Sequence, residues 1–178
     1  MKIIETKFKG LIIFKKDTHL DNRGYFRELF LEKSLKKKFP FDVISLSKIN
    51  VIRGLHLQTN KPQGKLLTVV KGKLLDVALD CRKKSKTFGK HFRITLSEEN
   101  NYSIYIPEGF AHGFCALKKD TLLHYKCTNY RNARSEIGIL WNDPALKIKW
   151  PISKPIVSSN DKVNLSFAEF NKKNTLNL

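Results

Sequence analysis

Turn signals recur about every eight to twelve residues along this chain, and this spacing restricts its fold more than any other feature. Clusters of Gly, Pro, Asn and Asp mark the turns, and short runs rich in apolar and β-branched residues lie between them. The clearest runs are residues 66–70, 74–79, 92–96, 103–106 and 121–126. A fold built from βαβ units would place longer helical segments between such runs. The pattern therefore predicts a mainly β protein, a sandwich or barrel, with one or two short helices.

One segment has the apolar spacing of a helix. Leu31, Leu35 and Phe39 stand at positions that would align on one helical face. Pro40 would then end the helix, because proline cannot continue the backbone hydrogen bonding. We therefore predict a helix over residues 31–39, with its lysines on the solvent face.

The length of 178 residues, with 41% hydrophobic and 28% charged residues, fits one globular domain. The sequence shows no internal repeat, low-complexity segment or internal boundary. We predict a single domain over residues 1–178, with a core over about 10–161 and a tail over 162–178. Residues 152–178 are polar and lack strong periodicity. We expect them to wrap the surface or fray, with room for a short second helix.

The formal net charge of +18 raises nucleic acid as a partner, because phosphate neutralisation dominates that type of binding. However, 27 of the 34 basic residues are Lys and only 7 are Arg. They are spread along the chain instead of gathering with aromatic residues on one element. A solvated, lysine-rich surface explains the charge better than a binding site does, so we expect no nucleic-acid partner.

The sequence lacks the features of a membrane or secreted protein. No window approaches the roughly 18 apolar residues of a spanning helix, and residues 1–10 alternate charged and apolar side chains, unlike a signal peptide. Cys81, Cys115 and Cys127 are an odd number without C-x-x-C spacing, which indicates neither a disulfide framework nor a zinc knuckle. We predict free thiols in or near the core, no membrane association and a cytoplasmic location.

The most informative segment is Arg53-Gly54-Leu55-His56-Leu57-Gln58. Alternate side chains of a regular strand share a face, which would direct His56 and Gln58 into a common cavity. Arg53 and Leu55 would then point the opposite way. A lone strand histidine is more often structural, so His56 gains weight only if a second chemical group lies nearby.

A second histidine follows a turn of Pro and Gly in the segment Pro107-Glu108-Gly109-Phe110-Ala111-His112-Gly113-Phe114. In β-barrels of the cupin type, a P-x-G-x-x-H element places its histidine inside the barrel, so His56 and His112 would share one site. The usual cupin metal set needs a His-x-His pair and a carboxylate, but Gln58 is a poor ligand and residues 59–64 hold no Glu. We therefore expect no metal, and we interpret His56 as a general base.

Seven separated motifs carry a wider similarity. They are Asp21-x-Arg23-Gly24-Tyr25-Phe26-x-Glu28, Arg53-Gly54-Leu55-His56-x-Gln58, Gln63-Gly64-Lys65-Leu66, Asp76-Val77-Ala78-x-Asp80-x-Arg82, Pro107-x-Gly109-Phe110-Ala111-His112-Gly113-Phe114, Tyr125-Lys126-x-Thr128-x-Tyr130 and Trp141-Asn142-Asp143-Pro144. In residues and order, this set resembles the dTDP-4-dehydrorhamnose 3,5-epimerases, a family of metal-free, cupin-like enzymes that act on sugar nucleotides. The similarity runs from about Gly10 to about Asp161.

The resemblance implies a cupin-like jelly-roll β-sandwich or barrel and a cofactor-free isomerase. The implied reaction inverts C3 and C5 of a nucleotide-linked 4-keto-6-deoxyhexose, converting dTDP-4-dehydro-6-deoxy-glucose to dTDP-4-dehydrorhamnose. The C4 ketone acidifies both protons, so removal of either leaves an enolate, and a proton returned on the opposite face inverts the carbon. The resemblance also implies a homodimer with N-terminal strands crossing to the partner, and a place in making deoxysugars for polysaccharide.

By this resemblance the catalytic residues are His56 as the base, Asp161 as the carboxylate that orients it, Lys65 as the cation at the enolate oxygen and Tyr125 as the proton donor. The implied substrate contacts are Arg23, Glu28, Arg53, Gln58, His112 and Glu136, with the arginines suited to a diphosphate. The residues alone leave structural alternatives open. These are a helix N-cap or turn for Asp161, a surface lysine for Lys65, a packing residue for Tyr125, a core histidine for His112, surface carboxylates for Glu28 and Glu136, and a turn residue for Arg23.

The chain departs from the family pattern in two places. Phe41-Asp42-Val43 stands where the family often has Gln-Asp-Asn, and Asn160 stands where Lys often precedes the aspartate. Both places lie among the family's substrate contacts, so the nucleotide base and the exact sugar stay open. The alternatives are a C3-only epimerase, an epimerase of a GDP-linked heptose, a 3,4-ketoisomerase, which Gln58 disfavours, a metal-dependent cupin oxygenase and a basic β-domain that binds nucleic acid.

Overall fold

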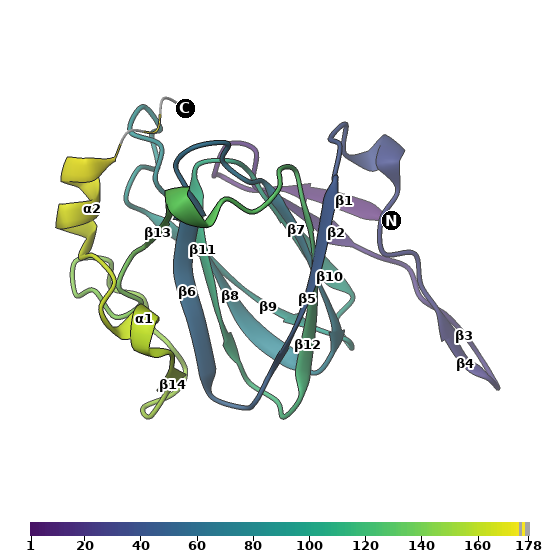
Figure 1. Cartoon of the computed structure of the whole chain (residues 1–178). Helices are drawn as coiled ribbons and strands as arrows, with labels where there is room; N and C mark the ends of the chain where they lie inside the picture. Colours follow the sequence, from purple (N-terminus) through teal and green to yellow (C-terminus); the bar gives the residue numbers. More distant parts are fainter. Residues whose placement is uncertain (175, 177–178) are drawn as a thin grey trace.

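The computed structural model describes residues 1–174 and 176, and its strands form two facing sheets with a hydrophobic core between them (Figure 1). The first sheet has the order β1 (Lys2–Glu5), β2 (Ile12–Lys15), β10 (Tyr102–Ile106), β7 (Lys65–Lys71), β12 (Thr121–Cys127) and β5 (Phe41–Ser47). The second has the order β13 (Glu136–Gly138), β6 (Val51–Gln58), β11 (Phe110–Ala116), β8 (Lys73–Asp80) and β9 (His91–Ser97), with β14 (Ile156–Val157) parallel to β6. A small hairpin of β3 (His19–Asp21) and β4 (Gly24–Phe26) projects from the sandwich.

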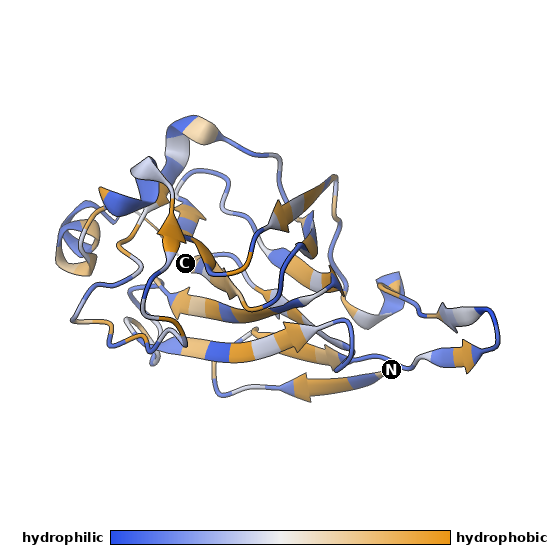
Figure 2. Cartoon of the chain, turned by 90° about the horizontal axis from the view of Figure 1, so that it is seen from below, coloured by the Kyte–Doolittle hydropathy of each residue, from blue (hydrophilic) through white to orange (hydrophobic). Residues whose placement is uncertain are grey.

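The predicted mainly β fold, a cupin-like jelly-roll sandwich with two short helices, is confirmed. All five predicted runs are strands, namely β7, β8, β9, β10 and β12, and each boundary agrees to within one residue. Hydrophobic residues concentrate in these strands, whereas the connecting loops are mostly hydrophilic (Figure 2). Turn residues and local apolar pattern therefore define the strands. Among the helices of the described residues, none has the length and hydrophobicity of a membrane span.

The predicted helix over residues 31–39 is wrong. A single 3-10 turn, Glu32–Ser34, is followed by extended backbone at Leu35, with φ −148° and ψ 102°. Leu35 and the partly buried Phe30 and Phe39 pack onto the outer face of the first sheet. A helix of nine residues has little stability in water by itself, whereas the extended path lets these side chains cover the sheet. Phe39 also precedes a proline, which disfavours helical backbone there.

The C-terminal segment is more ordered than its polar composition predicts. Helix α2 (Phe167–Lys173) packs on the outer face of the second sheet, and α1 (Ser159–Lys162) lies beside β6, as Figure 1 shows. Phe170 is fully buried in a second hydrophobic cluster there. A capping box between Ser166 and Glu169 begins α2. Of the two predicted alternatives, residues 162–174 and 176 therefore follow the one in which the segment wraps the surface, and α2 is a short helix of the kind expected there. Residues 175, 177 and 178 lie outside the described part. The assignment of residues 1–178 to one domain stays a prediction.

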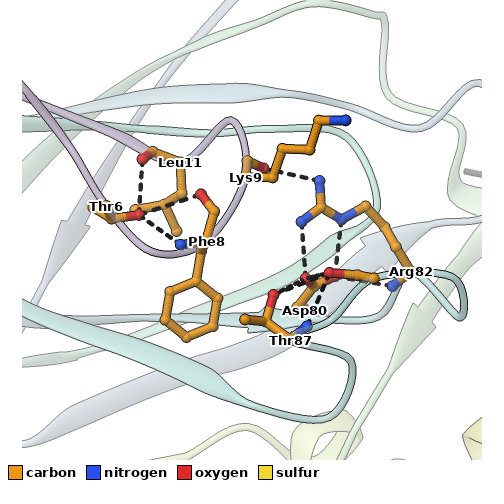
Figure 3. A network of polar contacts seen from close by, with 8 residues as sticks. Thr6, Phe8, Lys9, Leu11, Asp80, Arg82 and Thr87 are labelled. Atoms are coloured by element: carbon orange, nitrogen blue, oxygen red, sulfur yellow. Dashed lines mark hydrogen bonds and ion pairs between the residues drawn. The ribbon is translucent and has the colours of Figure 1, made fainter.

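A polar network joins the N-terminal loop to the end of β8 (Figure 3). The Asp80 carboxylate is completely buried and accepts hydrogen bonds from Arg82, Ser85 and Thr87. Arg82 also donates to the Lys9 carbonyl at 3.0 Å and lies over the Phe110 ring. Burial acts to raise the pKa of Asp80, but these hydrogen bonds outweigh it and lower that pKa. Asp80 and Arg82 therefore have a structural role.

Candidate active site

A cavity of about 920 Å³ opens between strands of the two sheets and the C-terminal segment. Eight of the ten predicted site residues line it, namely Arg53, His56, Gln58, Lys65, His112, Tyr125, Glu136 and Asp161. His56 and Tyr125 come from different sheets, on β6 and β12, and both face this one space. A volume of this size is in the range of sites that hold small ligands.

His56 and Asp161 form a partly buried hydrogen-bonded pair. His56 Nε2 lies 2.5 Å from Asp161 Oδ1, and the Asp161 side chain is only 6% exposed. Asp161 belongs to α1, whose N-cap is Ser158, so the alternative of an N-cap role for Asp161 is wrong. With its proton on Nε2 toward the carboxylate, the imidazole keeps a basic lone pair on Nδ1. This arrangement can remove a proton from a ligand in the cavity.

Two further donors hold the Asp161 carboxylate in place. The Gly54 N–H and the Asn164 side-chain amide donate to it at 3.3 and 3.1 Å. Burial acts to raise the pKa of Asp161, but the hydrogen bonds from His56, Gly54 and Asn164 outweigh burial and lower that pKa. Asp161 is therefore an anion that can stabilise a protonated His56. Sequence reasoning missed Asn164, which no motif marks.

The predicted orientation of Arg53, away from His56, is wrong. Arg53 pairs with Phe114 and His56 with His112, so β6 has one more residue than β11 over this stretch. This bulge puts Arg53 and His56 on the same cavity and sends Leu55 into the second hydrophobic cluster. A Cβ on Gly54 would lie 2.6 Å from the Gly113 Cα atom, and the φ of Gly54 is +111°. Only glycine fits this close approach of two strands.

A second imidazole and carboxylate pair lies beside the first. His112 Nε2 is 2.7 Å from Asp76 Oδ2, and His112 occupies the position on β11 opposite His56. Asp76 is completely buried, and its Oδ1 has no hydrogen-bond partner among the described residues. His112 is thus a nearly buried residue that still lines the cavity. Sequence reasoning assigned no role to Asp76, although a carboxylate inside the apolar run 74–79 was a usable signal.

Lys65 and Tyr125 line the same cavity from neighbouring strands. The Lys65 ammonium group makes no hydrogen bond or ion pair with any other described residue, and burial lowers its pKa. The Tyr125 hydroxyl donates to Ser45 Oγ at 2.5 Å, and burial raises the pKa of this phenol. The alternative of a surface position for Lys65 is therefore wrong. An ammonium group without a carboxylate partner is suited to stabilise negative charge on a ligand.

Gln58 and Glu136 line the cavity, but their polar atoms are already engaged. The Gln58 amide donates to the carbonyls of Lys61 and Tyr130 and accepts from the Asn132 N–H. It therefore fixes the loop at this end of the cavity. The Glu136 carboxylate accepts from Arg131 Nε at 3.0 Å. Arg131 also lines the cavity, and sequence reasoning missed it as a second cation near Arg53.

The single chain does not bring Arg23 and Glu28 to this cavity. Arg23 lies at the tip of the projecting hairpin and pairs with Asp21 at 2.5 Å, with 85% of its side chain exposed. Glu28 follows the hairpin and is exposed. In contrast, the positions that depart from the family pattern, Phe41, Val43 and Asn160, all line the cavity.

Within residues 1–174 and 176, no three His, Cys, Asp or Glu side chains converge in a way that could hold a metal ion. Both imidazoles use Nε2 to bind a carboxylate. The absence of a metal from the reaction stays a prediction.

The three cysteines are free and buried, as predicted.

Comparisons with known proteins show the family to which this chain belongs. The family model described as dTDP-4-dehydrorhamnose 3,5-epimerase matches residues 5–169. The dTDP-4-dehydrorhamnose 3,5-epimerase of Methanothermobacter thermautotrophicus is 42% identical, over 90% of this chain and 91% of the relative. The structure of a Legionella pneumophila dTDP-6-deoxy-D-glucose-3,5-epimerase in complex with dTDP-4-keto-L-rhamnose matches with TM-score 0.94 and 36% identity, over 99% of this chain and 98% of that chain. A 3'-monoepimerase from Streptomyces bikiniensis in complex with dTDP-quinovose matches with TM-score 0.89 and 27% identity, over 96% and 90%. This chain belongs to the dTDP-4-dehydrorhamnose 3,5-epimerase family.

Proposed function

We propose that this chain is an isomerase that inverts C3 and C5 of dTDP-4-dehydro-6-deoxy-glucose, giving dTDP-4-dehydrorhamnose. The observation that carries the proposal is a base and a phenol, His56 and Tyr125, lining one cavity from opposite sheets. Such a pair is what inversion requires, because one group removes a proton and the other returns one on the opposite face of the ring.

The steps follow from the contacts of the four residues. His56 Nδ1 takes the proton from the carbon beside the ketone, and the C–H electrons move to give an enolate at the C4 oxygen. Lys65 stabilises the enolate, and the Asp161 carboxylate stabilises the imidazolium. The Tyr125 phenol then gives its proton to the opposite face of the carbon and is left as a phenolate. Return of one proton to Tyr125 and loss of one from His56 restore the enzyme.

Two arginines near His56 support a nucleotide diphosphate as the rest of the substrate. Arg53 and Arg131 line the same cavity, and guanidinium groups bind phosphate oxygens through paired hydrogen bonds. Thymidine is preferred because the relatives named above bind dTDP sugars. A GDP-linked sugar stays an alternative, because Phe41 and Val43 change the cavity wall.

The heavy-water experiment tests this function directly. The purified protein is incubated in D₂O with a panel of dTDP- and GDP-linked 4-keto sugars, and deuterium and configuration at C3 and C5 are read by NMR. We expect deuterium at both carbons of the dTDP-linked 4-keto-6-deoxyhexose and inversion of both. Exchange at C3 alone would favour the second candidate, a C3-only epimerase, which the likeness to a 3'-monoepimerase supports. Exchange with none of the panel would contradict the proposed function.

We also propose that the protein acts as a homodimer in which the hairpin of one copy completes the cavity of the other. Arg23 was predicted to bind the diphosphate but lies on the projecting hairpin, away from its own cavity (Figure 1). The hairpin exposes large apolar side chains, with Leu20 79%, Phe26 66% and Tyr25 55% exposed. Exposed apolar groups of this kind fit a contact with a second copy.

The free buried thiols are consistent with the predicted cytoplasmic location.

Complementation between two variants should reveal the shared site. Arg23→Ala and His56→Asn should each be strongly impaired alone. Co-expressed, they should regain roughly one quarter of wild-type activity, because half the dimers are mixed and one of their two sites has both residues intact. The measurement is turnover of the whole co-expressed mixture, and tagged, purified mixed dimers should reach roughly one half of wild-type activity because one of their two sites is intact. If Arg23 acts in the cavity of its own chain, mixing restores nothing.

A further inference from the structure

We propose that Ser45 is a positioning residue for Tyr125. The Ser45 hydroxyl orients the phenol in the resting enzyme, and it then donates a hydrogen bond to the phenolate that forms when Tyr125 releases its proton. This inference rests on the proposed epimerase function and adds a residue to it. The seven motifs give Ser45 no role, and it is not among the residues that line the cavity.

The contact between the two side chains is short and is set by strand pairing. The Tyr125 hydroxyl donates to Ser45 Oγ at 2.5 Å. On paired strands β12 and β5, Tyr125 is opposite Val43, and Ser45 is opposite Leu123. Tyr125 and Ser45 are therefore diagonal neighbours, a separation that an aromatic side chain spans. Because Tyr125 lines the cavity and Ser45 does not, the serine acts on the phenol from behind.

Arg53 fixes the strand on which Ser45 lies. β5 is the last strand of its sheet, so only β12 pairs with it among the described residues. From the opposite sheet, Arg53 Nε donates to Ser47 Oγ at 3.1 Å and Nη2 donates to the Leu46 carbonyl at 3.2 Å. These bonds hold β5 immediately beside Ser45. The edge strand is thus clamped at the point where it orients the phenol.

The hydroxyl of Ser45 can serve both states of Tyr125. In the resting enzyme the Ser45 Oγ atom accepts a hydrogen bond from the phenol of Tyr125. When the O–H bond of Tyr125 breaks and the new C–H bond forms, the phenolate oxygen needs a donor, and the serine O–H can rotate to supply one. Burial raises the pKa of Tyr125, and the hydrogen bond from Ser45 acts to lower it. Loss of this donor therefore makes the phenol a weaker acid inside the cavity.

The test compares the two fates of the enolate in D₂O, which are return to labelled substrate and conversion to inverted product. With Ser45→Ala, proton removal by His56 continues, but delivery from Tyr125 slows. We expect kcat to fall about 10- to 100-fold. We also expect more deuterium in recovered substrate relative to inverted product than in the wild type, because the intermediate returns to the starting face more often. The basic limb of the pH profile should move to higher pH.

Two variants provide controls. Ser45→Thr keeps a hydroxyl and should restore the wild-type ratio of substrate exchange to inversion. Ser47→Ala removes a hydroxyl two residues along, which contacts Arg53, so it should raise KM. It should change that ratio far less than Ser45→Ala does, because the Tyr125–Ser45 contact and the Arg53 bond to the Leu46 carbonyl are kept. Circular dichroism and thermal unfolding check that each variant folds.

The outcomes separate this inference from the proposed function. If Ser45→Ala lowers exchange and inversion equally, or not at all, then Ser45 has no positioning role and the inference is overturned. If the wild type exchanges no 4-keto nucleotide sugar, the proposed function fails. An ultraviolet titration, which needs no substrate, then still tests the contact. With Tyr125→Phe identifying the signal, the Tyr125 phenol should ionise at higher pH in Ser45→Ala than in the wild type, and equal ionisation would overturn the contact itself.

Discussion

Replacing His56 with asparagine should lower kcat by about 10³- to 10⁴-fold and abolish deuterium exchange at both C3 and C5. Asparagine keeps a polar group of similar reach toward Asp161 but has no basic nitrogen, so no group is left to accept the substrate proton. Lys65 and Tyr125 stay in place, because neither contacts His56 directly through a hydrogen bond in the described structure. The measurement is solvent exchange by NMR together with turnover at saturating substrate.

His112→Asn is the matched control for this prediction. His112 has the same type of carboxylate partner and lines the same cavity, 2.7 Å from Asp76. As a substrate contact it should raise KM while exchange at C3 and C5 continues. A His56→Asn protein that still exchanged both positions at the normal rate would remove His56 as the base. Loss of exchange in His112→Asn alone would transfer that role to His112.

Replacing Lys16 with methionine should increase the free energy of unfolding at pH 7 by up to about 4 kcal/mol. The Lys16 side chain is buried and contacts the Thr68 hydroxyl at 3.0 Å, and its residue is 5% exposed. Burial, together with the positive charge of Arg27, lowers the pKa of Lys16 to about 7. The folded protein therefore holds an amine that loses its proton far more readily than it would in the unfolded chain.

The sign of the pH dependence follows from proton binding. Between pH 7 and the ordinary lysine pKa of 10.5, the unfolded chain binds the proton of Lys16 and the folded protein does not. Stability therefore rises with pH across this window, and the full cost of burying the charge is present below pH 7. Lys16→Met should remove this contribution to the slope. Thr68 and Ser103 remain satisfied in the variant, because their hydroxyls bond each other at 2.6 Å.

Denaturant unfolding of both proteins from pH 6 to pH 10, at one protein concentration, measures the difference in slope. Lys15→Met is the control, because Lys15 is the exposed neighbour of Lys16 and its replacement should reproduce the wild-type pH dependence. Equal slopes for wild type and Lys16→Met would show that the amine carries no burial cost.

The sequence predicted best what local pattern determines. Runs such as 66–70 and 121–126 lie between turn residues and alternate or fill with apolar side chains, so strand identity and boundaries were readable. The extended backbone of residues 31–39 could not be predicted, because the sheet face that their apolar side chains cover is built from strands distant in the sequence. The face of Arg53 was wrong because a bulge at Gly54 shifts the alternation by one residue, and nothing in strand period reveals a bulge.

The sequence predicted the site residues that belong to motifs and missed those that act through contacts formed only in the folded chain. The resemblance supplied His56, Lys65, Tyr125 and Asp161, and all four line the cavity. It could not supply Asn164 or Ser45, because these act through contacts with other side chains rather than through a motif. Arg131 was missed because a lone arginine in a loop carries no signal of its own in a chain with 34 basic residues.

The position of Asp161 in the chain has a consequence for synthesis. All of the strands precede it, while the carboxylate that completes the His56 pair comes from α1, which follows them in the chain. A ribosome that has already produced the whole sandwich has thus not yet produced a working catalyst. A nascent chain therefore lacks the carboxylate partner of His56 until α1 has emerged and docked, so the base is completed after the sheets.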